Sequence, residues 1–359
     1  MKRRDMLKFG VAGGAAAVAA PALAQSQPTI RWRMQSSFPK SLDTVFGGAT
    51  TIAQKVSKLT DGKFEIQVFS AGEIVGPLQV LDAVQIGTIE AGHTAGFYYI
   101  GKMPALVFDT GVPFGLTPRQ HNTWMRYGGG LELMRDLYKQ FNVVQIPCGN
   151  TGAQMGGWFR KEIKTVDDLK GLRMRAAGFL GSVFSKLGVV VQQIPAGDVY
   201  PALERGTLDA VEWVGPYDDE KLGFHKVANN YYAPGVMELG ASLCFIGNEA
   251  KMRELPAQYR EALEAACAEA NLDMLAKYDA YNIQALRRLL AANVQLRFWS
   301  NDIMKALQTA TAEAMQEFSA RDANFARVHQ QWKAFRDDQV LWSAVNDGAA
   351  ERFLAANRG

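Results

Sequence analysis

The sequence predicts an α/β protein in which two similar lobes are followed by a long helix that spans both. Three observations support this fold class. Strand-like and helix-like runs alternate twice along the chain, a helix-to-strand turn at Gly87 recurs at Gly206, 119 residues later, and helical spacing continues without a break over residues 257–293. Alternating strands and helices are typical of open, largely parallel sheets.

The first 24 residues have the features of a secretion signal. A basic stretch containing Arg3 and Arg4 precedes an apolar run at 9–20, and Pro-Ala-Leu-Ala at 21–24 supplies a cleavage site of the A-x-A type. The apolar run, about 12 residues, is shorter than the roughly 20 that span a bilayer. The arginine pair resembles a twin-arginine export signal, and an ordinary secretory signal is the alternative. Either signal predicts export.

Removal of residues 1–24 also changes the charge balance. It lowers the number of Lys and Arg residues from 39 to 35 and of Asp and Glu residues from 36 to 35, so the mature chain is almost neutral. A neutral chain has no electrostatic attraction for nucleic acid or an anionic membrane surface, and we predict no nucleic-acid partner. About 335 residues remain, which is more than one hydrophobic core usually supports. Two lobes are therefore the default expectation.

The first half of the chain has the order β-α-β-α-β. Alternating apolar residues predict strands, helical spacing predicts helices, and Gly62 and Gly87 follow the two helices as stop signals. The predicted strands are 30–34, 64–68 and 88–91, and the predicted helices are 42–60 and 79–86. We expect these strands to form a parallel sheet.

The same order recurs in the second half. The predicted helices are 166–170, 179–187 and 198–205, and the predicted strands are 172–175, 189–194 and 207–211. The apolar run at 189–191 predicts a strand that is buried on both faces, as in a parallel sheet. Residues 83–91 also match residues 202–210 as helix, glycine, threonine and strand. Chance is the alternative, but the shared place in the β-α-β order favours two lobes of similar structure.

The last third of the chain is mainly helical. The helix at 257–293 is long enough to lie across both lobes, a short strand follows at 294–299, and Ser300 can cap a further helix. We predict the following division of the chain: signal peptide 1–24; lobe I 25–148, with 238–256 returning to it; lobe II 149–237, with parts of 294–340; spanning helix 257–293; and a C-terminal helical tail 341–359.

Candidate site residues follow the carboxyl ends of the predicted strands, where open sheets bind ligands. Arg175 can hold a carboxylate by two parallel hydrogen bonds, although Arg173 and Arg175 share a strand face and one of them can simply be solvated. Gln154 lies in the glycine-rich stretch 149–157, where a surface glutamine is the alternative. Glu212 follows the strand that ends at residue 211, and a surface ion pair is the alternative.

Arg175 and Glu212 in one site have a further consequence. A carboxylate beside an anionic ligand repels it unless a cation lies between them. The pair therefore suggests a bound Na⁺ or Ca²⁺ with oxygen ligands from Glu212, Gln154 and a backbone carbonyl.

Enzyme motifs are scarce. The sequence has no P-loop, no G-x-S-x-G, no H-E-x-x-H and no dinucleotide-binding G-x-G-x-x-G, and its four histidines lack metal-ligand spacing. Three cysteines without C-x-x-C spacing argue against a thiolate metal site, while a Cys148–Cys244 disulfide stays open. The absent motifs argue against an enzyme, although catalytic residues need not be close in sequence.

Several motifs in order resemble one family. The export leader, VLDAVQIGTIE at 80–90, LKGLRMR at 169–175 and LERGTLDA at 203–210 together resemble the solute-binding proteins of tripartite ATP-independent periplasmic (TRAP) transporters. The resemblance covers essentially the whole mature chain. It implies a periplasmic binding protein fold with two α/β lobes and a hinge, a periplasmic location, no enzymatic activity, and delivery of a small organic acid to the membrane subunits of a transporter.

Two further segments indicate a branch of that family. GNTGAQ at 149–154 and VEWVGP at 211–216 look most like the members that bind 2-oxo acids such as pyruvate, or lactate, with a metal ion. This resemblance implies that Arg175 holds the carboxylate and that Gln154, Glu212 and the Trp213 carbonyl surround the cation, with Na⁺ favoured over Ca²⁺. It also implies three further ligand-site positions: Glu238, Asn150 and Tyr98.

Other functions stay open at this point. Within the class, the ligand can be lactate, a dicarboxylate or pyroglutamate. From another class, a periplasmic oxidoreductase is the alternative, because twin-arginine export often carries folded cofactor proteins. The branch also pairs through C-terminal helices, so the tail at 341–359, with Trp342 and Phe353, is compatible with a homodimer.

Overall fold

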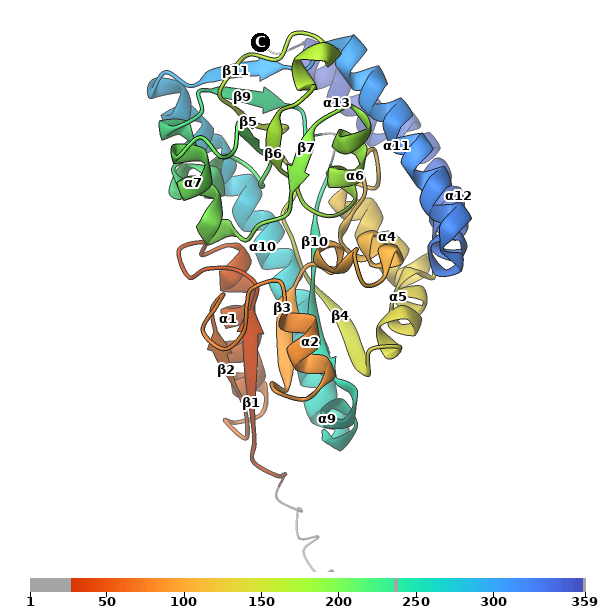
Figure 1. Cartoon of the computed structure of the whole chain (residues 1–359). Helices are drawn as coiled ribbons and strands as arrows, with labels where there is room; N and C mark the ends of the chain where they lie inside the picture. The colour runs from red at the N-terminus through yellow and green to blue at the C-terminus, as the bar shows by residue number, and fades with distance from the viewer. Residues whose placement is uncertain (1–26, 236–237, 358–359) are drawn as a thin grey trace, which may run out of the picture.

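The computed structural model describes residues 27–235 and 238–357 and contains two lobes, each built around one sheet (Figure 1). The predicted signal peptide lies outside the described residues. We call the part around the first sheet lobe I and the part around the second sheet lobe II. The exact lobe boundaries stay a prediction.

Lobe I contains a five-stranded sheet with the order β2-β1-β3-β10-β4. Its strands are β1 (Ile30–Ser36), β2 (Phe64–Phe69), β3 (Ala91–Thr94), β4 (Val143–Asn150) and β10 (Ser242–Asn248). β1 pairs in parallel with β2 and β3, whereas β10 runs antiparallel to both β3 and β4. The sheet is mixed rather than parallel, because the internal strand β10 enters between β3 and β4 from a late return of the chain.

Helices and two 3₁₀ turns surround this sheet and complete lobe I. They are α1 (Val45–Leu59), α2 (Val80–Gln85), α3 (Val107–Thr110), α4 (Pro118–Tyr127), α5 (Gly130–Lys139) and α9 (Glu249–Glu254), with 3₁₀ turns η1 (Gly96–Tyr99) and η2 (Pro104–Leu106). α1 buries Val45, Ile52 and Val56, whose spacing places them on one face of the helix. The predicted helices of this half are therefore present.

Lobe II contains a six-stranded sheet with the order β11-β9-β5-β8-β6-β7. Its strands are β5 (Gly157–Phe159), β6 (Arg173–Arg175), β7 (Val190–Gln192), β8 (Ala210–Val211), β9 (Asn230–Ala233) and β11 (Gln295–Phe298). Its helices are α6 (Gly178–Lys186), α7 (Ala196–Glu204) and α8 (Pro216–Leu222), with 3₁₀ turns η3 (Val166–Leu169) and η4 (Phe224–Lys226). This sheet is also mixed, since β5 runs antiparallel to β8 and β9.

Two expectations about strands were wrong. The valine run forms β7, which lies at the edge of its sheet and leaves Val190 53% exposed, so it is not buried on both faces. The strands predicted at 88–91 and 207–211 start about three residues later, at Ala91 and Ala210. In both places the chain first folds back on the preceding helix through the hydrogen bonds of the turn, which a residue pattern alone does not distinguish from a strand.

The helix α10 (Ala257–Ala291) spans both lobes (Figure 1). Its 35 residues extend about 52 Å, and it packs on α1 and β4 of lobe I and on α8 of lobe II. Ser300 then accepts a hydrogen bond from the Ile303 N–H and caps α11 (Asn301–Arg321), as predicted. α12 (Ala323–Val345) and α13 (Asp347–Ala356) complete the chain.

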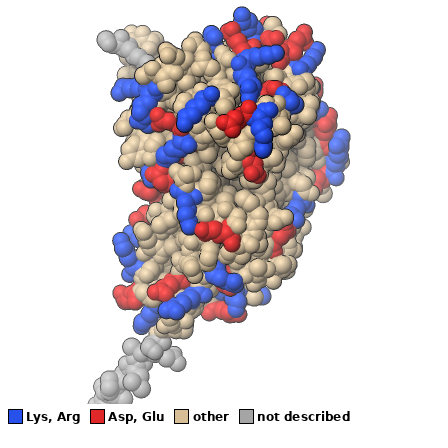
Figure 2. Space-filling view, turned by 60° about the vertical axis from the view of Figure 1, so that its left-hand side comes forward, with Lys and Arg blue, Asp and Glu red and all other residues tan. Residues whose placement is uncertain are grey.

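Cysteines, helix composition and surface charge bear on three further expectations from the sequence. Cys148, Cys244 and Cys267 are buried and free within the described residues, so the Cys148–Cys244 disulfide is not formed. Across residues 27–235 and 238–357, no helix combines the length and the apolar character needed to cross a bilayer. Positive and negative side chains are interspersed over the face shown in Figure 2, as expected of a nearly neutral mature chain.

Candidate functional site

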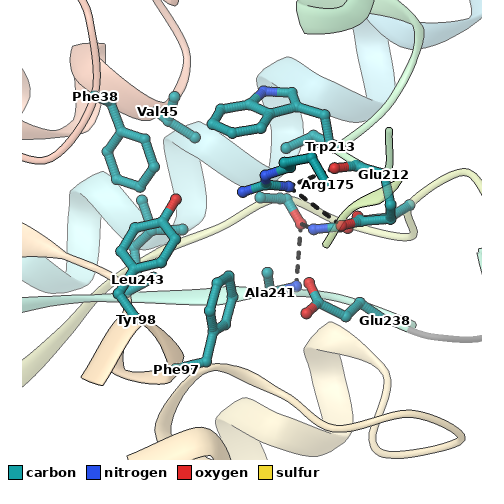
Figure 3. Close-up of a pocket in the computed structure, with 14 residues that line it drawn as sticks. Phe38, Val45, Phe97, Tyr98, Arg175, Glu212, Trp213, Glu238, Ala241 and Leu243 are labelled. Carbon is teal, nitrogen blue, oxygen red and sulfur yellow. Dashed lines mark hydrogen bonds and ion pairs between the residues drawn. The ribbon is translucent and has the colours of Figure 1, made fainter. Parts of the chain in front are cut away.

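A pocket lies between the two lobes, with about 360 Å³ of empty space that includes some open solvent (Figure 3). Lobe I contributes mostly apolar side chains and lobe II mostly polar ones. The lining residues are Phe38, Val45, Ala95, Phe97, Tyr98, Thr151, Gln154, Arg175, Glu212, Trp213, Val214, Glu238, Ala241 and Leu243. Six of the seven residues predicted from the sequence are in this list, although they span residues 98 to 238.

Arg175 ends β6 and is 2% exposed. Its Nη1 donates to the main-chain carbonyl of Glu212 and lies 3.4 Å from Glu212 Oε2, while its guanidinium lies 4.5 Å above the Trp213 ring. Arg173, two residues earlier on the same strand, is instead 45% exposed and pairs with Asp209 at 2.6 Å. The strand therefore presents one arginine to solvent and the other to the pocket.

Two carboxyl groups share the pocket with this one guanidinium. Glu212 is 3% exposed and Glu238 is 5% exposed. Burial raises the pKa of both carboxyl groups, and the positive charge of Arg175 opposes this shift in each. The nearby Glu212 raises the pKa of Glu238 further. The idea of a surface ion pair for Glu212 is wrong, because the pair with Arg175 is buried.

Gln154 presents an acceptor oxygen that is not used within the protein. Its Nε2 donates to Thr151 Oγ1 at 3.0 Å, and its Oε1 is buried without a hydrogen-bond partner in the described part of the chain. The segment is held in place by its main chain, since the Gln154 carbonyl accepts from Gly235 N at 3.0 Å. A Cβ at Gly235 would lie 2.2 Å from that carbonyl oxygen, so only glycine fits there. The alternative of a surface glutamine is wrong.

Tyr98 and Trp213 close the polar end of the pocket. Tyr98 belongs to η1, and its hydroxyl points toward the side where Arg175 lies (Figure 3). Burial raises the pKa of Tyr98 to about 12, so the hydroxyl stays neutral and can donate a hydrogen bond. Trp213 is 6% exposed and lies against the guanidinium of Arg175.

Asn150 is not among the residues that line the empty pocket, and its contact with a ligand stays a prediction. It is the last residue of β4, and its Oδ1 accepts from Gly152 N at 3.0 Å. The side chain therefore holds the turn that leads toward Gln154. Its buried Nδ2 has no hydrogen-bond partner among the described residues.

The sequence did not indicate the apolar wall of the pocket. Phe38, Phe97 and Leu243 face the polar residues from lobe I (Figure 3). Phe38 follows the carboxyl end of β1, and open sheets bind ligands beyond the carboxyl ends of their strands. Its position in the sequence could therefore have indicated a place in the pocket. Leu243 lies in the antiparallel strand β10, within the segment 238–256 that was predicted to return to lobe I, but no local pattern indicated that its side chain reaches the pocket.

The donor set of the pocket suits a hard cation. The unpartnered oxygens within the described structure include Gln154 Oε1 and Glu212 Oε1, and both groups line the pocket. Carboxylate, amide and carbonyl oxygens are the ligands that Ca²⁺ prefers, and they also suit Na⁺. No group of three His, Cys, Asp or Glu side chains that could hold a metal occurs in the described residues, so a cation here would depend on amide and carbonyl oxygens too.

Comparison with protein families shows to which family of proteins the chain belongs. Residues 35–322 match the model of bacterial extracellular solute-binding proteins, family 7. The chain belongs to this family. A relative from Nostoc sp., a monocarboxylate 2-oxoacid-binding periplasmic protein, is 52% identical over 331 residues, which cover 92% of this chain and 91% of the relative.

Solved structures agree with this assignment. A TRAP transporter solute-binding protein from Bordetella bronchiseptica matches with a TM-score of 0.90 and 51% identity over 92% of this chain and 98% of its own. It is a mixed-occupancy dimer with copurified calcium and picolinate. A TRAP periplasmic solute-binding protein from Pseudoalteromonas atlantica matches with a TM-score of 0.87 and 38% identity over 90% and 99% of the two chains, and it holds sodium and pyruvate.

These matches confirm the resemblance to TRAP solute-binding proteins and the two-lobe α/β fold. The family consists of periplasmic solute-binding proteins that bind small organic acids and work with TRAP membrane subunits. Nothing in the comparisons supports the oxidoreductase alternative.

Proposed function

We propose that this protein captures a small 2-oxo monocarboxylate such as pyruvate, together with a cation, in the periplasm and delivers it to the membrane subunits of a TRAP transporter. In this proposal the protein binds its ligand without transforming it. The observation that carries the proposal is the arrangement in one pocket of a buried guanidinium, two buried carboxyl groups, and oxygens that have no partner among the described residues.

Arg175 is the group that would hold the ligand's carboxylate. Its position is fixed by the Glu212 carbonyl and the Trp213 ring, so little side-chain freedom would be lost on binding. A guanidinium can form two parallel hydrogen bonds with a carboxylate. Tyr98, whose hydroxyl stays neutral, is placed to donate a further bond from lobe I.

A cation would balance the charge of the bound acid. Glu212 and the ligand carboxylate would place two negative charges near one guanidinium, and such charges repel by several kcal/mol at an effective dielectric constant near 20. Glu212, Gln154 and the main-chain carbonyl of Trp213 would supply oxygens from the protein, and the keto oxygen of the acid would supply another. Relatives hold either sodium or calcium together with pyruvate. We favour Na⁺ over Ca²⁺ because Glu212 is the single charged protein ligand in the proposed set, and Ca²⁺ affinity rises with the number of charged ligands.

The apolar wall favours a ligand with one carboxylate. The side of the pocket opposite Arg175 consists of Phe38, Phe97 and Leu243 (Figure 3). A second carboxylate directed at this wall would lose its hydration without gaining a charged partner. A methyl group would fit there, so pyruvate and lactate are favoured over a dicarboxylate.

Calorimetric titration tests this proposal. Pyruvate, lactate, succinate and pyroglutamate are titrated into refolded, ligand-free protein in three buffers: with sodium, with calcium, and with chelator and no sodium. We expect pyruvate to bind most tightly and only when a cation is present. Tighter binding of succinate, or full affinity for pyruvate without any cation, would contradict the proposal.

An absorption spectrum of the purified protein with flavin, haem or iron–sulfur bands would favour the oxidoreductase instead.

The C-terminal helices expose an apolar surface. Leu341 and Trp342 of α12 and Phe353 and Leu354 of α13 are 57–68% exposed in the single chain. An apolar surface of this kind is typical of an interface, and we propose that a second copy of the chain covers it. Light scattering should give the mass of a dimer for the mature chain, and the mass of a monomer for a Trp342→Ser, Phe353→Ser variant.

A further inference from the structure

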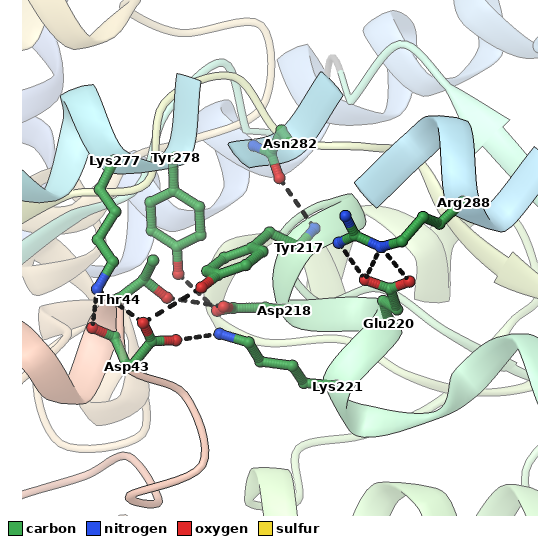
Figure 4. A network of polar contacts seen from close by, with 10 residues as sticks. All are labelled: Asp43, Thr44, Tyr217, Asp218, Glu220, Lys221, Lys277, Tyr278, Asn282 and Arg288. Atoms are coloured by element: carbon green, nitrogen blue, oxygen red, sulfur yellow. Dashed lines mark hydrogen bonds and ion pairs between the residues drawn. The ribbon is translucent and has the colours of Figure 1, made fainter. Parts of the chain in front are cut away.

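A second polar cluster joins the lobes beside the ligand pocket, where the turn before α1 meets α8 and α10 (Figure 4). Asp43 and Thr44 come from lobe I, and Asp218 and Lys221 come from α8 of lobe II. These four described residues do not line the ligand pocket. The cluster therefore joins the two parts that must separate when a ligand leaves, without touching that ligand.

Thr44 donates its hydroxyl hydrogen across the interface. It is the N-cap residue of α1, a position where threonine usually accepts from its own helix, yet within the described structure its side chain makes no capping hydrogen bond. Its Oγ1 instead donates to Asp218 Oδ1 at 2.7 Å. Both residues are at most 2% exposed. Lobe opening would therefore remove a donor from a carboxylate that is buried in the closed form.

Asp218 differs in this respect from Asp219, its neighbour on α8. Asp219 accepts hydrogen bonds from Trp158 Nε1 at 2.9 Å and from the Tyr231 hydroxyl at 2.7 Å, and both donors belong to the lobe II sheet. The second donor to Asp218 is the hydroxyl of Tyr278 on α10, at 2.5 Å. One carboxylate is thus satisfied within lobe II, whereas the other depends on lobe I and the spanning helix.

Asp43 adds charge to the same junction. Its carboxylate forms ion pairs with Lys221 of α8 and, at 2.7 Å, with Lys277 of α10. Burial raises the pKa of Asp43, but the two lysines outweigh burial and lower it to about 2, so the carboxylate is ionised. Without Asp43, both lysines would lose their ion-pair partner in lobe I, and Lys221 would keep only the attraction of Asp218 within its own helix. The lysine side chains are only 25–28% exposed, so solvent screens these ion pairs less than it screens pairs on the open surface.

We propose that Asp43 and Thr44 form a closure latch that stabilises the closed form whatever the pocket contains, and thereby sets how long a ligand is retained. The physical basis is that a ligand held only by the closed form has an apparent affinity proportional to the population of that form. The proposal concerns the lobes rather than the chemistry of the ligand. It rests on the proposed function only for the choice of pyruvate as a probe.

Four variants of the full mature chain test the latch. Thr44→Val removes the hydroxyl at nearly constant volume, and Thr44→Ser retains it. Asp43→Asn removes the charge at a half-exposed position. It therefore tests the latch even if Thr44→Val, at a buried position, impairs folding. Arg288→Gln is the matched control, because Arg288 of α10 pairs with Glu220 of α8 at 2.6 Å and involves no residue of lobe I.

Two measurements are made on each variant. Small-angle scattering of the ligand-free protein reports compactness, and stopped-flow release of pyruvate reports retention. We expect Thr44→Val and Asp43→Asn to give a larger radius of gyration, about tenfold faster release and an almost unchanged association rate. Thr44→Ser and Arg288→Gln should stay within about twofold of the original protein.

The outcomes separate the latch from the ligand assignment. If Thr44→Val and Asp43→Asn match the original protein in both compactness and release rate, the latch is wrong. Equal effects of Thr44→Ser and Thr44→Val would also overturn it, since the hydroxyl would then be irrelevant. If the original protein does not bind pyruvate, the proposed function fails, and ligand-free scattering alone decides whether the latch exists.

Discussion

The same backbone unit, a helix followed by a glycine turn and a short strand, has different roles in the two lobes. In lobe I, Gly87 N bonds to the Val84 carbonyl at 3.1 Å and Thr88 N to the Ala83 carbonyl at 2.8 Å. In lobe II, the equivalent bonds from Gly206 and Thr207 measure 3.0 and 2.9 Å. Both glycines have a positive φ, of 75° and 72°. The repeat seen in the sequence is therefore a repeat of hydrogen bonds.

The ion pairs that follow this turn are also repeated. Glu90 accepts from the main-chain and side-chain nitrogens of Arg33 on β1. Asp209 accepts from the same groups of Arg173 on β6. Each pair ties the residue before a short strand to the strand beside it. These contacts stabilise the unit and do not reach the pocket.

The lobes differ at the next residues along the paired strands. Gln35 and Arg175 occupy equivalent places, since each lies one residue beyond a paired methionine. Gln35 is satisfied inside lobe I, where it donates to the Val75 carbonyl and accepts from Ile74 N and Val75 N. His93 likewise corresponds to Glu212 and contacts Ser36 Oγ at 3.2 Å. The same backbone geometry thus supports hydrogen bonds within the protein in lobe I and a ligand pocket in lobe II.

The largest expected effect concerns Arg175. Arg175→Lys keeps the charge but loses the planar fork, and disruption of a buried, charged hydrogen bond typically costs about 2–5 kcal/mol. Titration with pyruvate should show affinity lower by at least tenfold. Arg173→Lys, on the same strand but facing solvent, should leave affinity unchanged. Equal affinities of the two variants would mean that the lobes do not differ in the way described.

The second prediction concerns Glu212 and its counterpart in lobe I. Glu212→Gln should weaken pyruvate binding by about tenfold or more and remove its dependence on the cation, because the charged metal ligand is lost. His93→Gln should change the stability of lobe I and leave the cation dependence intact. Titrations at several sodium concentrations measure both effects. Tighter binding by the Glu212→Gln variant would rule out a metal bridge.

The third prediction concerns a buried carboxyl group of lobe I that faces no ligand. Burial raises the pKa of Asp109 to about 6, against hydrogen bonds from Tyr138 and Gln145 that lower it. A raised pKa in the folded state stabilises the protein at low pH, and this contribution is lost as pH rises through about 6. Relative to Asp109→Asn, the original protein should lose about 2 kcal/mol of unfolding free energy between pH 4.5 and 7.5.

Denaturant unfolding at the two pH values measures this difference. An Asp109→Asn variant with the same pH dependence as the original protein would show that Asp109 does not titrate in this range. Pyruvate affinity should be the same in both proteins at pH 7.5, because Asp109 lies outside the pocket.

The smallest expected effect tests the repeated turn itself. Gly87→Ala and Gly206→Ala should each lower the free energy of unfolding by about 1 kcal/mol, since a side chain is disfavoured at positive φ. The two sites are sterically matched: an added Cβ would meet only Asn248 at 3.9 Å at Gly87 and nothing within 4 Å at Gly206. Unequal losses in denaturant unfolding would contradict the equivalence of the turns.

Much of the fold was predictable because its signals are local. Helical spacing over 257–293 corresponds to α10, and the echo between residues 83–91 and 202–210 corresponds to two matching turns. The late start of β3 and β8 was not predictable, because the folded-back turn and a strand share the same residue pattern. The antiparallel pairing of β5 and β10 was not predictable either, because their partner strands lie far away in the sequence and no local signal specifies the pairing.

The candidate site shows the same division. Arg175 and Glu212 could be selected from the sequence because of their chemistry and their places at the ends of predicted strands. Gln154 could be selected as an amide in the glycine-rich stretch 149–157. The choice between Arg173 and Arg175 required the structure, since alternation puts both on one strand face. Asn150 was placed in the site through the resemblance, and that placement stays a prediction, since the structure shows only that its Oδ1 accepts from Gly152 N.

The sequence by itself determined the elements, their order, the repeated turn and the chemistry available at the strand ends, because each depends on residues close together in the chain. Only the tertiary structure decided which side chains are buried together. The apolar wall of Phe38 and Leu243, and the contact of Thr44 with Asp218, join residues 174 or more positions apart. Such contacts follow from the way the two lobes close on each other and on α10, and no local pattern encodes that packing.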